Sequence, residues 1–314
     1  RLKKAKVSLP GGCVLGPRPV NLHLSGFSAL GAKIEEESGY VLASADKLKG
    51  NIIYFDRPSH TGTENVMMSA CLAEGETLLV NAACDPEVVD VANFLNSMGA
   101  EVKGAGSSII RISGVKKLKA IEHTCIKDRL EAGTFLMAAV ITGGYLEIND
   151  FLPDYLDMVI LKLREMGAEI NANMNFIKVK GPSKLKPVTV TTYPFPGYPT
   201  DLQSSIMALS CTASGSSYIR ETVFEDRFTH VMELNRLGAE IKVSGDRAIV
   251  NGVAKLKGAS VMASDIRAGA GLVLAGLSAE GETEVLRIYH IDRGYDSFEE
   301  KLSSLGASIK RVKV

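Results

Sequence analysis

The sequence has no excess of charge of either sign. Lysine plus arginine and aspartate plus glutamate each number 36 in 314 residues, so the formal net charge is +0. Bulk charge therefore gives no reason to expect a nucleic acid or a membrane surface as a partner. Any site that binds anions must be built locally.

Long apolar runs are also missing. The apolar segment 135–141, FLMAAVI, is followed by Gly143 and Gly144 and is too short to cross a bilayer. We find no signal-peptide pattern and expect a cytoplasmic protein. With 46% hydrophobic and 23% charged residues, the composition is typical of a globular protein with a sizeable core, and the length suggests two domains.

The cysteines are few and show no pairing pattern. They number five, an odd count, and form no CxxC pair. This argues against a disulfide framework or a zinc site and favours reduced thiols. The five histidines show no ligand spacing, so we predict no metal site and no cofactor. The cysteines are Cys13, Cys71, Cys84, Cys125 and Cys211.

What the sequence does contain is an internal repeat. The tripeptide Leu/Met-Gly-Ala occurs at 30–32, 98–100, 166–168, 237–239 and 305–307, at spacings of 68, 68, 71 and 68 residues. Each copy ends a segment with helical periodicity, where a glycine suits the left-handed residue that closes a helix. Two alternating segments typical of paired strands then follow.

The full repeat is predicted to be strand, helix, strand, helix, strand, strand. Its first helix is rich in small residues, as in 63–73, 131–141 and 265–276. Small side chains let helices approach closely, so we expect these helices inside a bundle with the sheets outside. The period is too long for a solenoid repeat.

A glycine-rich segment near the start, SLPGGCVLGPRPVNLH at 8–23, surrounds Cys13. Its spacing Gly11-x4-Gly16 is like that of a phosphate loop, but Pro17 and Arg18 stand where Lys and Ser or Thr are needed. A lone cysteine is usually a small buried side chain. Here the glycines and Arg18 favour an exposed turn with local positive charge, which raises thiol reactivity.

Four further segments, together with this cysteine loop, are long and unusual. They are PTDLQ at 199–203, ETVFEDRF at 221–228, ASDIRAGAGLVLAG at 263–276 and RIYHIDRGY at 287–295. With them the chain resembles the enolpyruvyl transferases, in particular those that act on UDP-N-acetylglucosamine. The resemblance implies the inside-out α/β barrel of that family, with two pseudo-threefold domains of βαβαββ units. We expect an incomplete first domain at 1–127 and a second at 128–314.

The resemblance also implies an activity. Family members transfer the enolpyruvyl group of phosphoenolpyruvate to the 3′-hydroxyl of UDP-N-acetylglucosamine and release phosphate, the committed step toward peptidoglycan, without metal or cofactor. About 100 residues of the family pattern precede Arg1 and would bring a Lys-Asn pair and an arginine. A complementing N-terminal segment is therefore an expected partner, and the activity of this chain alone stays open.

The resemblance also implies roles for individual residues, each of which lies in one of the matching motifs. Cys13 would transfer a proton to phosphoenolpyruvate and be alkylated by fosfomycin. Asp201 would be the base for the 3′-hydroxyl, although its position also suits an N-cap. Arg18 and Arg293 would hold phosphoenolpyruvate, because guanidinium groups pair with phosphate and carboxylate. The expected substrate-binding residues are Arg18, Pro19, Val20, Asn21, Leu22, Arg57, Ser59, His60, Thr61, Asp201, Val223, Arg227, Arg267 and Arg293.

Two other functions stay open from the sequence. One is enolpyruvyl transfer of the type catalysed by 5-enolpyruvylshikimate-3-phosphate synthase. The segments PGGC and RPVNLH argue against this alternative and favour the nucleotide-sugar enzyme. The other is a non-catalytic fragment or paralogue that binds UDP-sugar.

The segment 57–65, RPSHTGTEN, departs from the family's uridine-diphosphate loop at His60 and Thr61, although Gly62 to Asn65 can still open a helix toward the diphosphate. RAGAG at 267–271 superficially resembles a dinucleotide glycine motif, but it lacks the preceding buried strand and a correctly spaced acidic residue, so we interpret it as a helix-packing segment.

Overall fold

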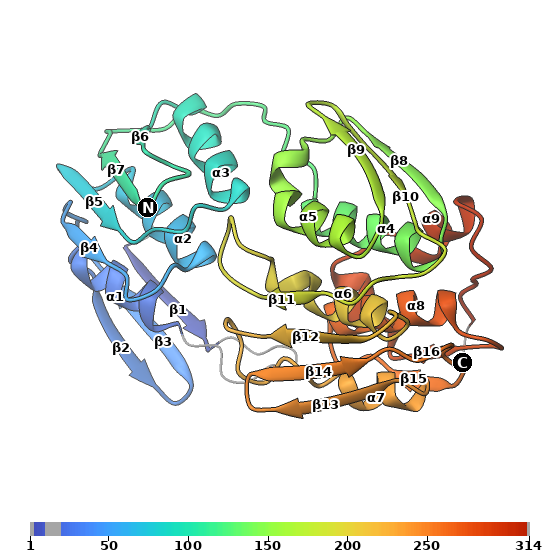
Figure 1. Cartoon of the computed structure of the whole chain (residues 1–314). Coiled ribbons are helices and arrows are strands. Elements are labelled where there is room, and N and C mark those ends of the chain that lie inside the picture. The colour runs from blue at the N-terminus through green and yellow to red at the C-terminus, as the bar shows by residue number, and fades with distance from the viewer. Residues whose placement is uncertain (1–2, 10–19, 313–314) are drawn as a thin grey trace. The chain divides into compact units, whose positions relative to one another are not determined.

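The computed structural model describes residues 3–9 and 20–312 (Figure 1). The described residues fall into two compact units, 3–9 with 20–126, and 127–312, and each has its own apolar core. Unit 1 contains β1 Lys4–Ser8, α1 Asn21–Ala29, β2 Lys33–Glu37, β3 Tyr40–Ser44, β4 Ile52–Tyr54, α2 His60–Ala70, β5 Glu76–Val80, α3 Pro86–Ser97, β6 Glu101–Lys103 and β7 Ile109–Ser113.

Unit 2 repeats the same kinds of element. It contains α4 Arg129–Ile141, β8 Tyr145–Asn149, η1 Pro153–Leu156, α5 Asp157–Glu165, β9 Glu169–Asn173, β10 Phe176–Lys180, β11 Thr189–Thr191, η2 Thr200–Leu202, α6 Gln203–Ser210, β12 Ser216–Arg220, α7 Val231–Arg236, β13 Glu240–Ser244, β14 Arg247–Asn251, β15 Ser260–Met262, α8 Ile266–Ser278, β16 Glu284–Leu286, η3 Ile288–Arg293 and α9 Phe298–Ser304.

The predicted βαβαββ repeat is confirmed. It runs in full from β4 to β7 and again from β11 to β14, with sheet orders β4-β5-β7-β6 and β11-β12-β14-β13. In both sheets the first two strands are parallel and the other pairs antiparallel. Among the described residues, β8-β10-β9 shows the same order without a first strand, and β15-β16 shows only the first parallel pair.

The glycine of each Gly-Ala signature closes a helix as predicted. All five glycines are left-handed: Gly31, Gly99, Gly167, Gly238 and Gly306 have φ between +86° and +101°. Each signature also repeats one hydrogen-bond pattern, in which the glycine N–H and the alanine N–H bond carbonyls three and five residues back. This is the Schellman closure, which satisfies carbonyls at a helix end that have no partner within the helix.

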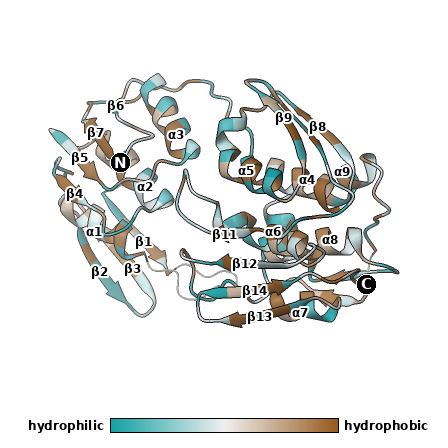
Figure 2. Cartoon of the chain, in the orientation of Figure 1, coloured by the Kyte–Doolittle hydropathy of each residue, from teal (hydrophilic) through white to brown (hydrophobic). Residues whose placement is uncertain are grey.

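The small-residue helices of unit 2 lie inside, as expected. Helices α4, α6 and α8 contact one another, and every residue of α6 is buried. Most of α8 is apolar or neutral in Figure 2, and eight of its residues are buried. Gly271 of α8 lies against the backbone of Ser204, where an added Cβ would stand 2.9 Å from the carbonyl oxygen. Glycine is needed here because two helix backbones nearly touch.

A matched pair of glycine-to-alanine substitutions tests how closely backbone segments pack within the repeats. At Gly252, after β14, an added Cβ would stand 1.7 Å from the Ala213 carbonyl oxygen, whereas at Gly238 nothing lies within 4 Å and only φ is unfavourable, at +86°. We expect Gly238→Ala to cost about 1–2 kcal/mol of unfolding free energy and Gly252→Ala about 3 kcal/mol or more, because the backbone must move. Denaturant unfolding of both variants measures this, and equal losses would contradict it.

Candidate functional site

The sequence-predicted site residues fall into three groups. Cys13, Arg18 and Pro19 lie outside the described residues. Unit 1 carries Val20, Asn21, Leu22, Arg57, Ser59, His60 and Thr61. Unit 2 carries Asp201, Val223, Arg227, Arg267 and Arg293.

Asp201 is the centre of the unit 2 cluster. It lies in the short turn η2 that leads into α6, and its two carboxylate oxygens accept from different arginines. Arg227 Nη2 donates to Oδ1 at 2.7 Å, and Arg267 Nε donates to Oδ2 at 3.1 Å. The first turn of α6 has no side-chain cap, so Asp201 does not serve as the N-cap that its position allowed.

These arginines keep Asp201 ionised. Burial alone would raise the pKa of the carboxyl group, but the charges and hydrogen bonds of Arg227 and Arg267 together hold the pKa below its ordinary value of 3.8. Each carboxylate oxygen has a second lone pair, and a third of the Asp201 side chain is still exposed, at 33%. Asp201 can therefore accept a further hydrogen bond from a hydroxyl group.

Both arginines are themselves fixed by aromatic rings. The Arg227 guanidinium lies 5.0 Å from the ring centre of Phe224, and that of Arg267 lies 5.4 Å from the ring centre of Tyr295. Tyr295 in turn shares a 2.8 Å hydrogen bond with Thr134 of α4. The Asp201 cluster is thus connected to α4 as well as to α6 and α8, which makes its geometry rigid.

Glu221 is a buried anchor of this cluster, and no role was expected for it from the sequence. It is 3% exposed, and its carboxylate accepts four hydrogen bonds. The donors are the hydroxyls of Thr192 and Thr200 and the backbone N–H groups of Val223 and Phe224, at 2.8–3.1 Å. Thr200 also accepts from Arg227 Nη1 at 3.0 Å. Glu221 therefore positions both the turn of Asp201 and the loop of Val223. Acidic residues are common in such segments, and no spacing signal in the sequence identifies it.

Arg293 ends η3, two residues before Tyr295. It lines an open hollow of about 730 Å³ together with Arg311 and a set of carboxylates. Carboxylates outnumber arginines in this lining, so the hollow alone does not favour an anion. The acidic residues are Asp128, Glu131, Asp292, Asp296, Glu299 and Glu300.

His230 lies near Arg227 of the Asp201 cluster, and its protonation makes the free energy of unfolding depend on pH. Burial is the main cause that lowers the pKa of His230 from 6.5 to about 4. The charge of Asp265 acts in the opposite direction, and the charge of Arg227 lowers the pKa further. The unfolded chain therefore binds a proton between pH 6.5 and 4 that the folded chain does not. The unfolding free energy is expected to fall as pH is lowered through this window, by up to about 3 kcal/mol.

Denaturant unfolding between pH 4 and 7 tests the contribution of His230. His230→Asn should remove this part of the pH dependence, because asparagine does not titrate. His290→Asn, at a half-buried histidine elsewhere in unit 2, is the matched control and should retain it. The same pH dependence in both variants would show that His230 is not responsible.

The unit 1 residues come together at the starts of two helices. Val20 is the N-cap of α1, Asn21 and Leu22 follow it, and Ser59 is the N-cap of α2. His23 joins the two helices: its Nε2 lies 3.5 Å from Thr61 Oγ1 and its Nδ1 lies 2.7 Å from Asn65 Nδ2. Two runs nearly 40 residues apart, at 20–22 and 59–61, thus lie at neighbouring helix N-termini, where backbone N–H groups favour phosphate.

The start of α2 differs from the expectation. The helix begins at His60 rather than at Gly62, because Ser59 Oγ accepts from the Gly62 N–H at 3.2 Å. His60 Nε2 lies 3.1 Å from Glu64 Oε1, and the interaction with this carboxylate raises the pKa of the histidine. The two residues that depart from the family pattern are thus both held by side chains of unit 1, His60 by Glu64 and Thr61 by His23.

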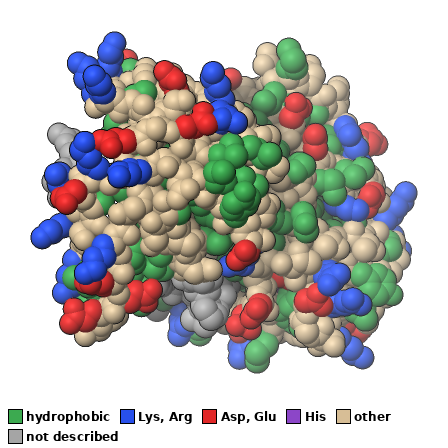
Figure 3. All heavy atoms as spheres, turned by 90° about the vertical axis from the view of Figure 1, so that its left-hand side faces the viewer, with side chains coloured by type: hydrophobic (Ala, Val, Ile, Leu, Met, Phe, Trp, Pro, Cys, Tyr) green, Lys and Arg blue, Asp and Glu red, His purple; other side chains and the backbone are tan. Residues whose placement is uncertain are grey.

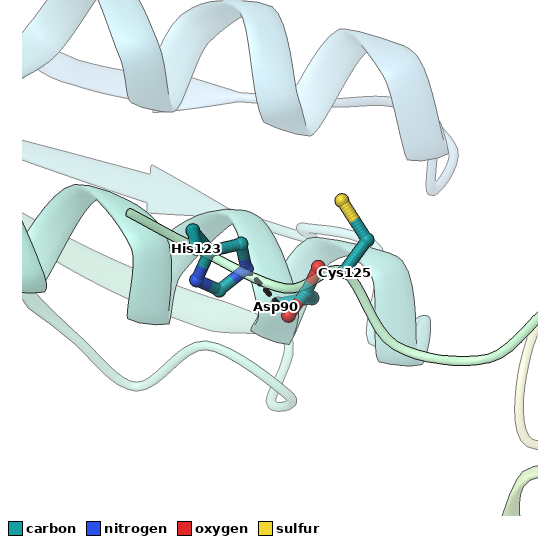
Figure 4. Close-up of side chains that lie close together, drawn as sticks. All are labelled: Asp90, His123 and Cys125. Atoms are coloured by element: carbon teal, nitrogen blue, oxygen red, sulfur yellow. Dashed lines mark hydrogen bonds and ion pairs between the residues drawn. The ribbon is translucent and has the colours of Figure 1, made fainter. Parts of the chain in front are cut away.

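The described residues include one group that could ligate a metal. Asp90, His123 and Cys125 of unit 1 have their ligand atoms within 4.8 Å of one another (Figure 4). The histidine spacing considered in the sequence could not reveal it, because Asp90 is more than 30 residues away from His123. We find no comparable group elsewhere in the described ranges, 3–9 and 20–312.

Two further observations concern the length of the helices and the charge of the surface. Within the described residues no helix is both long and apolar enough to span a bilayer. On the face shown in Figure 3, basic and acidic side chains are interspersed. The described part of that face therefore lacks the broad basic surface typical of nucleic-acid binding.

Comparisons with known proteins agree on one family. Residues 1–302 match EPSP synthase (3-phosphoshikimate 1-carboxyvinyltransferase). UDP-N-acetylglucosamine 1-carboxyvinyltransferase 2 of Carboxydothermus hydrogenoformans is 55% identical over 314 residues, which are 99% of this chain and 75% of that protein. The UDP-N-acetylglucosamine 1-carboxyvinyltransferase of Geobacter metallireducens is 54% identical over 310 residues, 99% of this chain and 74% of that protein.

Solved structures show the same fold. The enolpyruvyl transferase NikO from Streptomyces tendae superimposes with a TM-score of 0.86 at 26% identity, over 98% of this chain and 74% of that one. The EPSP synthase from Acinetobacter baumannii gives a TM-score of 0.75 at 21% identity, over 98% of this chain and 75% of that one.

Proposed function

The chain belongs to the EPSP synthase family of carboxyvinyl transferases, and from this premise we propose that its acceptor is UDP-N-acetylglucosamine and its donor phosphoenolpyruvate. The proposal rests on one observation, the difference in sequence identity between this chain and two members of the family. The chain is 55% identical to a UDP-N-acetylglucosamine 1-carboxyvinyltransferase but 21% identical to an EPSP synthase of the same fold. The acceptor would then come from the nucleotide-sugar branch rather than the shikimate branch of the family.

The proposed reaction is addition followed by elimination. Asp201 accepts the proton of the sugar 3′-hydroxyl while that oxygen attacks C2 of phosphoenolpyruvate, and Cys13 delivers a proton to C3. Loss of phosphate from C2 and of a proton from C3 then restores the double bond and leaves the enolpyruvyl ether. The ionised state of Asp201 and its remaining lone pairs support this role.

Arginines supply the fixed charge in this proposal. Arg18 and Arg293 would contact phosphoenolpyruvate, with Arg227 and Arg267 in support. Donors that are already oriented need no rearrangement when charge moves in the transition state. The ion pairs of Arg227 and Arg267 with Asp201, and the rings that cover both, support such pre-orientation.

The nucleotide would bind to unit 1 in this proposal. Val20, Asn21 and Leu22 at the start of α1, and Arg57, Ser59, His60 and Thr61 at the start of α2, would hold the uridine diphosphate. The adjacency of the two helix N-termini around His23 supports this assignment.

A complementing N-terminal segment remains part of the proposal. In the complete repeats the second strand has a parallel first strand beside it, as β5 has β4 and β12 has β11. Within the described residues β8 has no such neighbour, and β16 lacks the antiparallel pair that follows in the complete repeats. Open edges of this kind accept added strands.

The cellular setting follows from the same proposal. The product would enter peptidoglycan synthesis, and with it cell-wall formation, cell shape and division. A cytoplasmic location is supported by the cysteines, because Cys71, Cys84, Cys125 and Cys211 are all free.

Phosphate release tests the function. The chain is incubated with phosphoenolpyruvate and either UDP-N-acetylglucosamine or shikimate 3-phosphate, alone and with an added N-terminal segment of a relative. Release with the nucleotide sugar only is the expected result. Release with shikimate 3-phosphate only would assign the sister reaction. Binding of the nucleotide sugar without release in either preparation would make the chain a non-catalytic binder.

Fosfomycin tests the proposed role of Cys13. The epoxide should alkylate Cys13 in the active preparation, and Cys13→Asp should keep turnover yet resist the inhibitor, because a carboxyl group carries a proton but is a poor target for the epoxide. Mass spectrometry locates the label, with Cys84→Ser as the control. A label on another cysteine would exclude the assignment.

A further inference from the structure

The Asp90, His123 and Cys125 group contains none of the residues assigned to transfer. Asp90 is on α3, and the other two belong to the irregular stretch between β7 and α4. His123 Nε2 and Asp90 Oδ1 are 3.0 Å apart, and all three ligand atoms are within 4.8 Å of one another. Figure 4 shows His123 and Cys125 on either side of the Asp90 carboxylate.

Two of the three side chains are already held in place. The His123 ring packs on Phe94, with ring centres 4.9 Å apart, and Phe94 is one helical turn from Asp90 on α3. The side chains of His123 and Asp90 are only 20% and 14% exposed. Cys125 is exposed, so its sulfur can turn without displacing packed neighbours.

We propose that these three residues form a site for a divalent zinc-type cation. Zinc prefers nitrogen, sulfur and carboxylate ligands at about 2.0–2.3 Å in a tetrahedron, which places ligand atoms about 3.3–3.6 Å apart. The His123–Asp90 separation is already near this value. The sulfur has to approach by no more than roughly 1.2–1.5 Å, which a rotation of the exposed Cys125 side chain supplies.

The charges also suit the ion. A carboxylate and a thiolate balance the two positive charges of the metal, and a neutral imidazole completes the protein ligands. A water molecule would occupy the fourth position, since the site opens to solvent at Cys125. Binding would replace the hydrogen bond between His123 and Asp90 by two metal bonds and tie the stretch 123–125 to α3. The proposed metal site does not depend on the proposed transfer.

A cobalt titration tests the site in the full chain. Zinc gives no spectrum, so Co²⁺ is added and the near-ultraviolet thiolate-to-cobalt absorption is followed, and Zn²⁺ is then used to displace it. We expect one cobalt ion per chain with thiolate absorption. Cys125→Ser should abolish the absorption, and His123→Asn should weaken binding by at least about 10-fold.

Two other cysteines serve as controls. Cys84→Ser and Cys13→Ser should each leave the cobalt absorption unchanged, because neither residue belongs to the group. Circular dichroism checks that the variants are folded. Absorption that persists in Cys125→Ser, absorption that is lost in Cys13→Ser, or no binding by the folded chain at micromolar metal would each overturn the proposal.

Discussion

Replacing Asp201 by asparagine is expected to reduce turnover by about 10²–10⁴-fold, the range that a positioned acid or base supplies. The amide has nearly the same shape but cannot accept the proton of a sugar hydroxyl. It also removes the negative charge that faces Arg227 and Arg267, of which Arg227 is 5% exposed. The measurement is steady-state phosphate release, together with binding of UDP-N-acetylglucosamine, which should remain measurable.

An exposed, ion-paired carboxylate serves as the control for removing one negative charge from unit 2. Asp246 pairs with Arg220 Nε at 2.7 Å, but it lies at an exposed turn, with 45% of its side chain accessible. Asp246→Asn should leave turnover unchanged, because exposed pairs contribute little. Full activity in Asp201→Asn would end the assignment of Asp201 as the base.

Replacing Glu221 by alanine is expected to cost about 3–5 kcal/mol of unfolding free energy. Alanine removes the acceptor of four hydrogen bonds and leaves buried hydroxyl and amide donors without a partner, each at a cost of about 1–3 kcal/mol. The melting temperature of unit 2 should fall by roughly 10 °C. Turnover should fall as well, because Thr200 and the Val223 loop lose their common anchor.

Glu221→Gln is the control for this prediction. Glutamine keeps one oxygen for the backbone N–H groups of Val223 and Phe224, and its amide nitrogen can donate to Thr200 Oγ1. We therefore expect less than half the stability loss of the alanine variant. Calorimetry of both variants decides: a negligible loss in Glu221→Ala would mean that Glu221 is not the anchor, whereas equal losses would mean that an amide cannot replace its carboxylate.

The repeat was predictable because its signals are local. A glycine that must be left-handed and an alanine behind it stand next to each other in the sequence, so each helix end could be found without knowledge of the fold. The small-residue helices were equally visible, since close backbone approach at Gly271 requires a small residue in the helix itself. The division at 127/128 into two domains stays a prediction.

The contacts of the site were less predictable. Arg227 and Arg267 could be named from their motifs, but their joint pairing with Asp201 spans 26 and 66 residues. Glu221 gathers donors from three segments, and His123 meets Asp90 only after α3 has packed. Such contacts depend on the tertiary fold, and no spacing rule describes them. The roles of Cys13 and Arg18 rest on the family resemblance alone.

The packing of α6 against α8 has a consequence for motion in unit 2. Ser204 Oγ donates to the Arg267 carbonyl at 2.6 Å, and Gly271 lies against the backbone of Ser204. Helices in such contact cannot slide or tilt without a clash, so their amides should exchange with solvent only through global unfolding. We therefore expect α6 and α8 to move as one body, and with them Asp201 in η2 and Arg267 at the start of α8.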